Sequence, residues 1–587
     1  MNEIASPIDF TVGGTLGRII GVDTGRASID VHDHELLTQV AIGDLVAVRG
    51  AMTTEHLIGV VDRVTRSADE EPLLEEETEA GEVPVEGGQR DLVRIVLVGT
   101  YRSVDGERKN VLKRGADSFP QIDREAFLVK GASLQALMSL FATGLAKDER
   151  LELGHFVADV SASAIADGNK LFQRHAALLG STGTGKSWAV ALILERAAAL
   201  AHSNLIVFDM HGEYTPLTEG ENPVATGYRM AGPGDVENPG KEALFLPYWA
   251  LNQEEMLALL LERGDQNAPN QASHFASIVR ELKGATAEAA GATAVAETFT
   301  VDSPIPYSID ELLKRLRADD TERLPSTQKG KDKGGPLFGK LTRFINRLAA
   351  KRDDRRYAFL LQPPKKTEEY GWLAEQAAQL LRADADNPGI KVIDFSEVPS
   401  DILPVVAGVL ARTLYDIQFW LDEEQRTPLA LVCDEAHLYL PVVEEADALA
   451  GRALAAFERI AKEGRKYGVA LFVISQRPSD VSRTILSQCN NFIAMRLTND
   501  RDQGVIRRFV SDSLAGLIDA LPLLDVGEAL VLGDAMLLPT RVKLNKPSVE
   551  PASATRDFWT EWGADAPDPA AITAAVEALR RQVRASA

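Results

Sequence analysis

The chain has 587 residues, of which 45% are hydrophobic and 25% charged, as in globular proteins of about three or four domains. The only cysteines are Cys433 and Cys489, which excludes a disulfide framework and favours a reducing, cytoplasmic location. The amino terminus has no signal-peptide pattern, and no apolar run is long enough for a membrane span, so we expect no membrane partner. The net charge of −23 argues against a nucleic-acid-binding surface that is basic overall.

Residues 1–120 are predicted to form a small β-barrel, because short apolar runs alternate there with Gly and Asp turns. The expected strands are Leu16–Val22, Ala27–Val31, Asp44–Val48, Leu57–Val61 and Leu92–Val98. Nine carboxylates and no Lys or Arg lie in residues 67–89, so we expect a disordered acidic insertion there.

Residues 121–248 and 388–546 are predicted to be the two parts of one α/β core. Continuous apolar runs bounded by turns are typical of parallel strands that are covered on both faces. The expected strands are Ala176–Leu179, Leu205–Phe208, Leu429–Cys433, Val469–Ile474 and Ala529–Leu532, with a helix at Ala446–Arg465.

A complete G-x-x-x-x-G-K-S phosphate loop follows the first of these strands and precedes a helix-like stretch. Its residues are Gly180, Ser181, Thr182, Gly183, Thr184, Gly185, Lys186 and Ser187. The glycines let backbone N–H groups face the phosphates, where the helix N-terminus adds partial positive charge. Lys186 would reach the β- and γ-phosphates, and the Ser187 hydroxyl would hold Mg²⁺. The loop predicts a nucleoside triphosphate site, and no guanine-reading motif accompanies it.

Acidic and amide side chains follow three further predicted strands. Asp434 would supply a hard oxygen ligand for Mg²⁺, and Glu435 would polarise the attacking water as a general base. Asp209 and Glu213 are possible supporting acids, and Glu213 is the rival to Glu435 for the base. Gln476 would contact the γ-phosphate or the water, unless it only belongs to a turn before a proline.

Residues 249–387 are predicted to be an inserted helical subdomain, with helices at Gln253–Arg263, Leu341–Leu348 and Trp372–Arg382. The segment from Arg323 to Lys366 contains thirteen basic residues and only three acidic ones. Within it, residues 326–335 are expected to be a loop. The candidate DNA contacts are Lys340, Arg343, Arg347 and Lys351. The alternative is that these residues balance local acids.

Two arginines are candidates for stabilising the charge that develops on the γ-phosphoryl group. Arg174 would act within its own subunit and Arg465 in the site of a neighbouring subunit, and the alternative for each is a surface salt bridge. Phe419 and Trp420 are expected to pack in the core. Residues 547–587 form an extension, in which Asp568 and Pro569 predict a helix that reaches Val583.

Several short sequence motifs, and their order along the chain, resemble those of the HerA family of hexameric DNA translocases, within the HerA–FtsK branch of P-loop ATPases. They are RHAALLGSTGTGKS at 174–187, DMHGEY at 209–214, LPYW at 246–249, CDEAH at 433–437, EGRKYG at 463–468, SQRPSD at 475–480, RLTND at 496–500 and the segment 521–544. The first domain is similar to the HAS-barrel that HerA shares with ATP synthase subunits.

The resemblance implies a RecA-like core, a homo-hexamer with ATP and Mg²⁺ at each interface, and double-stranded DNA in a central pore. It also implies that Lys186 and Ser187 contact nucleotide, Asp434 the metal and Gln476 the γ-phosphate. Glu435 would be catalytic. A nuclease or Sir2-like effector is the expected partner, in DNA-end processing or antiviral defence.

Two alternatives stay open at this stage. The first is a ring that acts mainly as an assembly scaffold or regulator of a partner effector. The second is a conjugation or secretion motor of the same branch. The absence of a predicted membrane span weighs against the second alternative.

Overall fold

The computed structural model describes most of the chain and divides it into two compact units. The described residues are 7–68, 89–143, 145–232, 234–236, 239–261, 264–325, 332–381, 389–442, 448–510, 514–553, 556–563 and 569–581. The first unit takes its residues from Met1–Ala197, Ile474–Ser479 and Ser487–Ser548. The second takes them from Ala198–Val473, Asp480–Leu486 and Val549–Ala587. The predicted acidic insertion lies almost wholly outside the described residues, as do residues 326–331 of the predicted loop.

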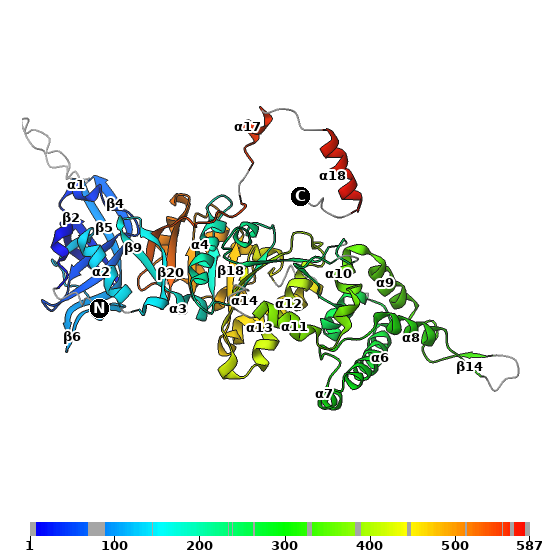
Figure 1. The fold of residues 1–587 in the computed structure, drawn as a ribbon. Coiled ribbons are helices and arrows are strands. Elements are labelled where there is room, and N and C mark those ends of the chain that lie inside the picture. Colours follow the sequence, from blue (N-terminus) through cyan, green and yellow to red (C-terminus); the bar gives the residue numbers. More distant parts are fainter. Residues whose placement is uncertain are drawn as a thin grey trace, which may run out of the picture. The chain divides into compact units, whose positions relative to one another are not determined.

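The first unit begins with the predicted β-barrel, drawn in blue in Figure 1. Its strands are β1 (Thr15–Asp23), β2 (Arg26–Val31), β3 (Leu45–Arg49), β4 (Glu55–Ala68), β5 (Gln89–Asp105), β6 (Arg108–Arg114) and β7 (Glu125–Val129), with the short helix α1 (His34–Leu37). The strand order is β2-β1-β7-β3-β4-β5-β6, and pairing of β2 with β5 closes a six-stranded barrel. Because β7 is part of it, the barrel extends past the predicted limit of residue 120.

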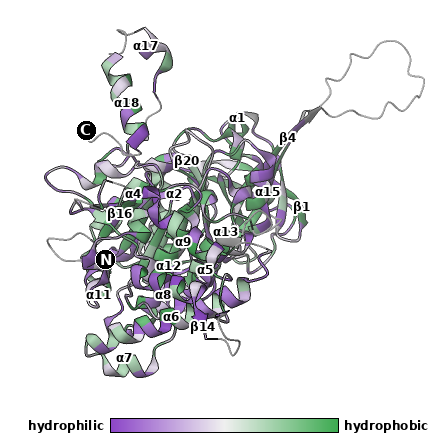
Figure 2. Ribbon diagram, turned by 90° about the vertical axis from the view of Figure 1, so that its right-hand side faces the viewer, coloured by the Kyte–Doolittle hydropathy of each residue, from purple (hydrophilic) through white to green (hydrophobic). Residues whose placement is uncertain are grey.

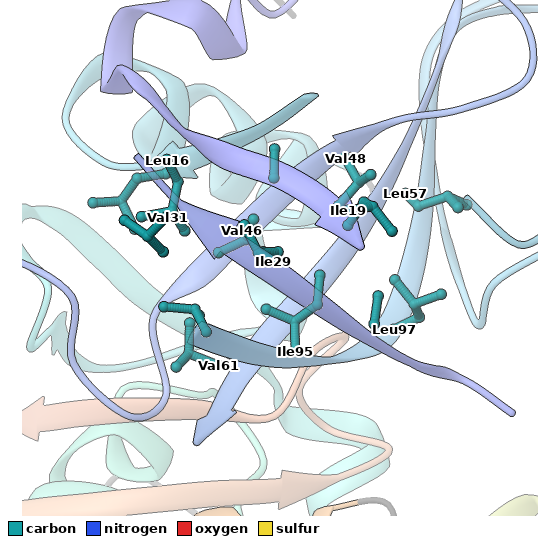
Figure 3. Packing of buried hydrophobic residues seen from close by; sticks show 14 of the residues in the cluster. Leu16, Ile19, Ile29, Val31, Val46, Val48, Leu57, Val61, Ile95 and Leu97 are labelled. Atoms are coloured by element: carbon teal, nitrogen blue, oxygen red, sulfur yellow. The ribbon is translucent and has the colours of Figure 1, made fainter. Parts of the chain in front are cut away.

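Alternate residues of the barrel strands point inward and fill its interior, as Figure 3 shows. In β2 buried positions alternate strictly with partly exposed ones, and Ile29 and Val31 are on the inner face. They meet Ile19, Val46 and Ile95 from other strands, each with no more than 4% of its surface exposed. This period-two pattern is what made the strands visible in the sequence.

The rest of the first unit is a sheet that contains the strand before the phosphate loop. The strand order is β10-β19-β20-β21-β8-β9. These strands are β8 (Arg150–Phe156), β9 (Asp159–Asp167), β10 (Ala176–Leu179), β19 (Asn491–Ala494), β20 (Glu528–Gly533) and β21 (Thr540–Leu544). The helices are α2 (Ala132–Thr143), α3 (Gly168–Gln173), α4 (Lys186–Ala198), α14 (Arg483–Gln488), α15 (Asp500–Phe509) and α16 (Ala515–Asp519), of which α4 and α14 run into residues of the second unit.

The second unit contains parallel strands in the order β13-β12-β16-β11-β17-β18. They are β11 (Leu205–Asp209), β12 (Thr226–Met230), β13 (Ala243–Leu244), β16 (Ile390–Asp394), β17 (Leu429–Cys433) and β18 (Val469–Ser475), and the last two residues of β18 belong to the first unit. The helices α12 (Leu403–Trp420) and α13 (Ala448–Glu463) pack against each other. Figure 2 colours α12 largely green because most of its residues are apolar and buried. The α/β fold class is therefore confirmed.

The predicted helical insertion is present in the second unit and is drawn in green in Figure 1. Its helices are α5 (Gln253–Leu260), α6 (Ala268–Ala289), α7 (Thr293–Thr298), α8 (Ile309–Thr321), α9 (Thr342–Asp353), α10 (Ala358–Leu361) and α11 (Trp372–Leu381), with a small hairpin of β14 (Arg323–Leu324) and β15 (Lys333–Gly334). The rings of Phe275 and Phe344 join α6 to α9, with centroids 5.9 Å apart.

The chain ends with α17 (Phe558–Trp562) and α18 (Pro569–Arg581). The helix after Pro569 was predicted, whereas its expected cap Asp568 and its expected end Val583 lie outside the described residues. The prediction that Trp420 is a core residue is wrong, because it is the last residue of α12 and 81% of its surface is exposed. Among the described residues, every helix is too short or too polar to cross a membrane.

Candidate nucleotide site

The phosphate loop is built as the sequence predicts, between the buried strand β10 and the first turn of α4. Gly183 and Gly185 have φ angles of +74° and +96°, a left-handed conformation that glycine adopts without strain. A Cβ atom on Gly180 would lie 2.8 Å from the Met495 side chain. Glycine is therefore required at these positions to turn the chain and to pack the loop on its neighbour.

Internal hydrogen bonds hold the loop in this shape. The Lys186 ammonium and the Thr184 hydroxyl both donate to the Ser181 carbonyl oxygen, at 3.2 and 2.8 Å. The Gly527 N–H donates to the Thr184 carbonyl at 2.9 Å, so the turn before β20 braces the loop from outside. The loop is thus a preformed anion cradle, in which the Lys186 ammonium can exchange the Ser181 carbonyl for a phosphate oxygen.

Gln476 lies beside the phosphate loop, at the end of β18. The Thr182 hydroxyl donates to its side-chain oxygen at 2.5 Å, and the Gly180 N–H donates to the Ser475 carbonyl at 3.3 Å. Both bonds lie within the first unit. The structure therefore brings Gln476 together with the loop, as expected for a residue that senses the phosphate.

The predicted acids meet in the second unit, at the carboxyl ends of β11 and β17. These strands pair in parallel with Phe208 opposite Cys433, so Asp209 and Asp434 follow at the same sheet edge. Asp434 and Glu435 are only 4% and 9% exposed. Glu435 has a φ of +43°, which is rare for a residue with a side chain and is typical of strained functional positions. His437 is next to it, with Nδ1 3.3 Å from Oε2 of Glu435.

Burial and mutual repulsion shift the ionisation of this acidic cluster, which we define as Asp209, Glu213, Asp434 and Glu435. Burial raises the pKa of Asp434 well above its usual value, and the charges of the other three acids raise it further. Burial also raises the pKa of Asp209 to about 6, against the effect of its hydrogen bonds. A cluster that holds several negative charges out of water calls for a cation.

Asp209 organises the turn that follows β11. One of its carboxylate oxygens accepts the N–H groups of His211 and Glu213, at 3.2 and 3.0 Å, and the other accepts the N–H of Tyr214 at 2.9 Å. Its oxygens are therefore occupied by backbone donors, which makes Asp209 a supporting acid that positions Glu213.

The two candidate arginines lie far from the nucleotide-binding groups of their own units. Arg174 precedes β10, and the phosphate loop follows it, so about 13 Å of strand lies between them. Its guanidinium forms an ion pair with Asp534, which also pairs with Arg114 of the barrel strand β6. The prediction of a contact within one subunit requires Arg174 to lie at the phosphate loop of its own chain. The structure does not place it there.

Arg465 of the second unit, like Arg174 of the first, precedes a strand and so lies at the edge of the sheet where that strand begins. It lies in the turn before β18, whereas Asp434 follows β17, which is parallel to β18. The two residues are therefore at opposite edges of these strands. The Arg465 side chain is exposed, and within the described part of the chain no carboxylate pairs with it.

The four basic residues predicted to contact DNA fall into two groups in and before α9. Lys340 and Arg343 are exposed, and the Lys340 ammonium donates to the Pro336 carbonyl at 2.8 Å. Arg347 is partly buried and donates to the Leu260 carbonyl at 3.1 Å, and the Lys351 ammonium lies 4.5 Å from the centre of the Tyr357 ring. The second pair therefore has internal packing roles.

Sequence reasoning missed two residues beside the acidic cluster. Asp394 ends β16, whose register places it opposite Asp209, and its charge contributes to the raised pKa of Asp209. The available signal was weak, because Lys391 interrupts the apolar residues Ile390, Val392 and Ile393 that precede this acid. Tyr214 is fully buried, and its hydroxyl has no hydrogen-bond partner among the described residues. Nothing in the sequence indicated that this ring would face the acids.

Comparison with known proteins agrees with these motifs. Residues 151–414 match the family model described as the central domain of helicase HerA. A probable helicase of Methanocaldococcus jannaschii is 25% identical over 539 residues, which cover 90% of this chain and 91% of that protein. The DNA double-strand break repair helicase HerA of Pyrococcus furiosus is 26% identical over 427 residues, which cover 68% and 70% of the two chains. The chain is therefore similar to the HerA helicases over its central region and over most of its length.

Solved structures similar to this chain include VirB4 of Thermoanaerobacter pseudethanolicus, which is 16% identical with a TM-score of 0.45 and covers 69% of this chain and 99% of that one. The plasmid coupling protein TrwB in complex with a non-hydrolysable ATP analogue is also 16% identical, with a TM-score of 0.42 and coverage of 71% and 92%. The phosphate loop and the similarity to HerA helicases together identify the chain as a P-loop ATPase with an α/β core.

Asp209→Ala should open the turn at residues 210–214, because three backbone N–H groups lose a charged acceptor. Hydrogen–deuterium exchange of peptides from this turn should become at least about tenfold faster. Asp394→Ala is the matched control, since Asp394 accepts the Ser396 N–H instead, and it should leave the Tyr214 amide protected. Equal exchange of the turn in wild type and Asp209→Ala would contradict this role.

Proposed function

We propose that this chain hydrolyses ATP with Mg²⁺ and converts the energy into movement along double-stranded DNA. The preformed phosphate loop, with Gln476 bonded to it, is the observation that carries the nucleotide part of this proposal. The family match supports DNA as the substrate, because the relatives that match are named as DNA repair helicases.

The residues present fit ATP and Mg²⁺ in their chemistry. Lys186 would exchange the Ser181 carbonyl for a phosphate oxygen, and the Ser187 hydroxyl and the Asp434 carboxylate would be the protein ligands of the metal. Among the described residues no set of three or more His, Cys, Asp or Glu side chains is arranged to hold a metal. This agrees with magnesium, which usually takes one or two protein oxygens and fills its shell with phosphate and water. Bound Mg²⁺ would offset the negative charge of the acidic cluster.

Glu435 is the proposed general base. Its carboxylate would accept a proton from the attacking water as that oxygen forms a bond to the γ-phosphorus, and ADP would leave with the electron pair of the broken P–O bond. The nearby His437 and the left-handed backbone of Glu435 fix the direction of this side chain. Gln476 would register loss of the γ-phosphate through Thr182.

We further propose that the active form is a homo-hexameric ring, assembled with a nuclease or Sir2-like effector in the cytoplasm, in DNA-end processing or antiviral defence. The exposed position of Arg465, at the sheet edge opposite the acids, supports a role in the site of a neighbouring subunit. The mass of the intact assembly purified from its host would test both the ring and the effector.

Glu435→Gln should bind ATP with nearly unchanged affinity and hydrolyse it at least about a hundredfold more slowly, because the amide cannot accept the proton. Lys186→Ala should lose ATP binding itself, since it removes the cation of the loop. Nucleotide binding and phosphate release, measured on the same preparations, separate the two effects. Full turnover by Glu435→Gln would contradict its assignment and point to Glu213 instead.

Arg465→Ala should be inactive alone and should recover part of its hydrolysis in rings mixed with Glu435→Gln subunits. In such a ring some interfaces combine an intact Glu435 with an intact Arg465 from the neighbour. The readout is phosphate release as a function of the mixing ratio. A strictly proportional loss of activity, without recovery, would rule out action between subunits.

Lys340→Glu combined with Arg343→Glu should weaken duplex DNA binding and lower the slope of log affinity against log salt by about two, since two phosphate contacts are lost. Arg317→Glu is the control, because Arg317 is an exposed cation on the neighbouring helix α8. It should leave the slope unchanged. The same affinity and slope in all three proteins would show that these cations do not contact DNA.

A further inference from the structure

The first turn of α4 contains a large aromatic residue, Trp188, that is less buried than the residues after it. The helix is otherwise a core element, and every residue from Ala189 to Leu194 is buried. Trp188, two residues after the phosphate-loop lysine, is only partly buried. A large ring that stays partly in water at this position has a surface available for a ligand.

Lys546 lies against this ring, with its ammonium nitrogen 5.2 Å from the ring centre. The segment that carries Lys546 follows β21 and is fixed on both sides. The Asn545 N–H donates to the Leu153 carbonyl at 2.9 Å, and the Ser548 hydroxyl donates to Glu195 of α4 at 2.7 Å. The cation is therefore held over the indole by the fold, at a distance typical of a cation–π contact.

The same segment is joined to the phosphate loop. The Lys543 ammonium donates to the Val526 carbonyl at 2.7 Å, and the next residue, Gly527, donates its N–H to the Thr184 carbonyl at 2.9 Å. The loop, the first turn of α4 and the chain after β21 thus form one connected surface of the first unit. Trp188 and Lys546 both lie on this surface.

We propose that Trp188 and Lys546 form the subsite for the base of the nucleoside triphosphate, and that this base is a purine. The inference rests on the proposed nucleotide function. The phosphates follow the loop, and the α-phosphate ends at the first turn of the helix, so the ribose and base continue past Ser187 toward position 188. The base stacks on the face of the indole that Lys546 does not cover, and the Lys546 ammonium on the opposite face holds the ring in position.

The larger ring system of a purine overlaps the indole more fully than a pyrimidine does, which is the basis for the choice of class. The alternative is that the Trp188–Lys546 pair only packs the chain after β21 onto α4. A packing role would alter the binding of all phosphate ligands together, whereas a base subsite alters only ligands that carry a base. This difference decides the experiment.

The test measures the dissociation constants of ATP, CTP and inorganic tripolyphosphate, each with Mg²⁺, by calorimetry on the full-length chain. Wild type should bind ATP more tightly than CTP. Trp188→Leu should weaken ATP binding about tenfold or more and reduce the preference over CTP, while its affinity for tripolyphosphate stays unchanged. Trp188→Phe, which keeps an aromatic face, should retain most of the ATP affinity, and Lys546→Ala should weaken ATP binding to a smaller extent.

Equal weakening of ATP and tripolyphosphate by Trp188→Leu would overturn the inference in favour of packing, and so would unchanged binding of all three ligands. Failure of the proposed function looks different, because wild type would then bind neither ATP nor tripolyphosphate. Quenching of indole fluorescence by ATP gives a second readout. It should be present in wild type, absent in Trp188→Leu and absent with tripolyphosphate.

Discussion

The parallel pairing of β11 with β17 is the constraint on which the chemistry of the second unit depends. It brings two acid-ended strands to one edge and buries their carboxylates. Burial raises the pKa of Asp434 and of Asp209, and the charge of Asp209 raises the pKa of Asp434 further. Such an arrangement lowers the stability of the empty site and favours a bound cation. Asp209 accepts three backbone N–H groups, which stabilise its buried charge. Asp434 and Glu435 are then the acids proposed to bind the metal and to activate water.

The first unit, in contrast, gathers positive charge at the site where an anion would bind. Its loop gathers N–H groups, a helix N-terminus and the Lys186 ammonium, and it holds them in place with the Ser181 and Thr184 carbonyls. A cradle that is already formed loses little conformational freedom when an anion binds. The chain as a whole is acidic, yet exposed cations remain at Lys340, Arg343 and Arg465, so acidity overall does not exclude local contacts with polyanions.

Local sequence patterns predicted the phosphate loop, the acids at the strand ends and many of the strands, because these depend on short-range physics. The phosphate loop needs glycines at fixed spacing, and β17 is a continuous apolar run that ends in two acids. The barrel strands were visible through their period-two alternation. The strands β12, β13 and β16 of the second unit were missed, as were β8, β9, β19 and β21 of the first. Lys391 is a buried charge that interrupts the apolar pattern of β16, and β12 is mostly only half-buried.

Contacts between side chains that are far apart in the sequence could not be predicted from local sequence patterns. Arg174 pairs with Asp534, 360 residues away, and nothing local to either residue indicates this contact. Arg347 and Lys351 look like any other cations in a basic run, although one donates to a buried helix end and the other covers a tyrosine ring. The distribution of these roles follows from tertiary packing. It separates the exposed cations, which are available to DNA, from those that hold the subdomain together.

The coupling of ATP hydrolysis to duplex DNA is the central claim, and steady-state phosphate release by the purified, assembled chain tests it most directly. With saturating Mg²⁺-ATP, addition of double-stranded DNA should raise the rate several-fold, and the stimulation should disappear at high salt as phosphate contacts are screened. A rate that is the same with and without duplex DNA, in an assembly that binds both ligands, would contradict the account.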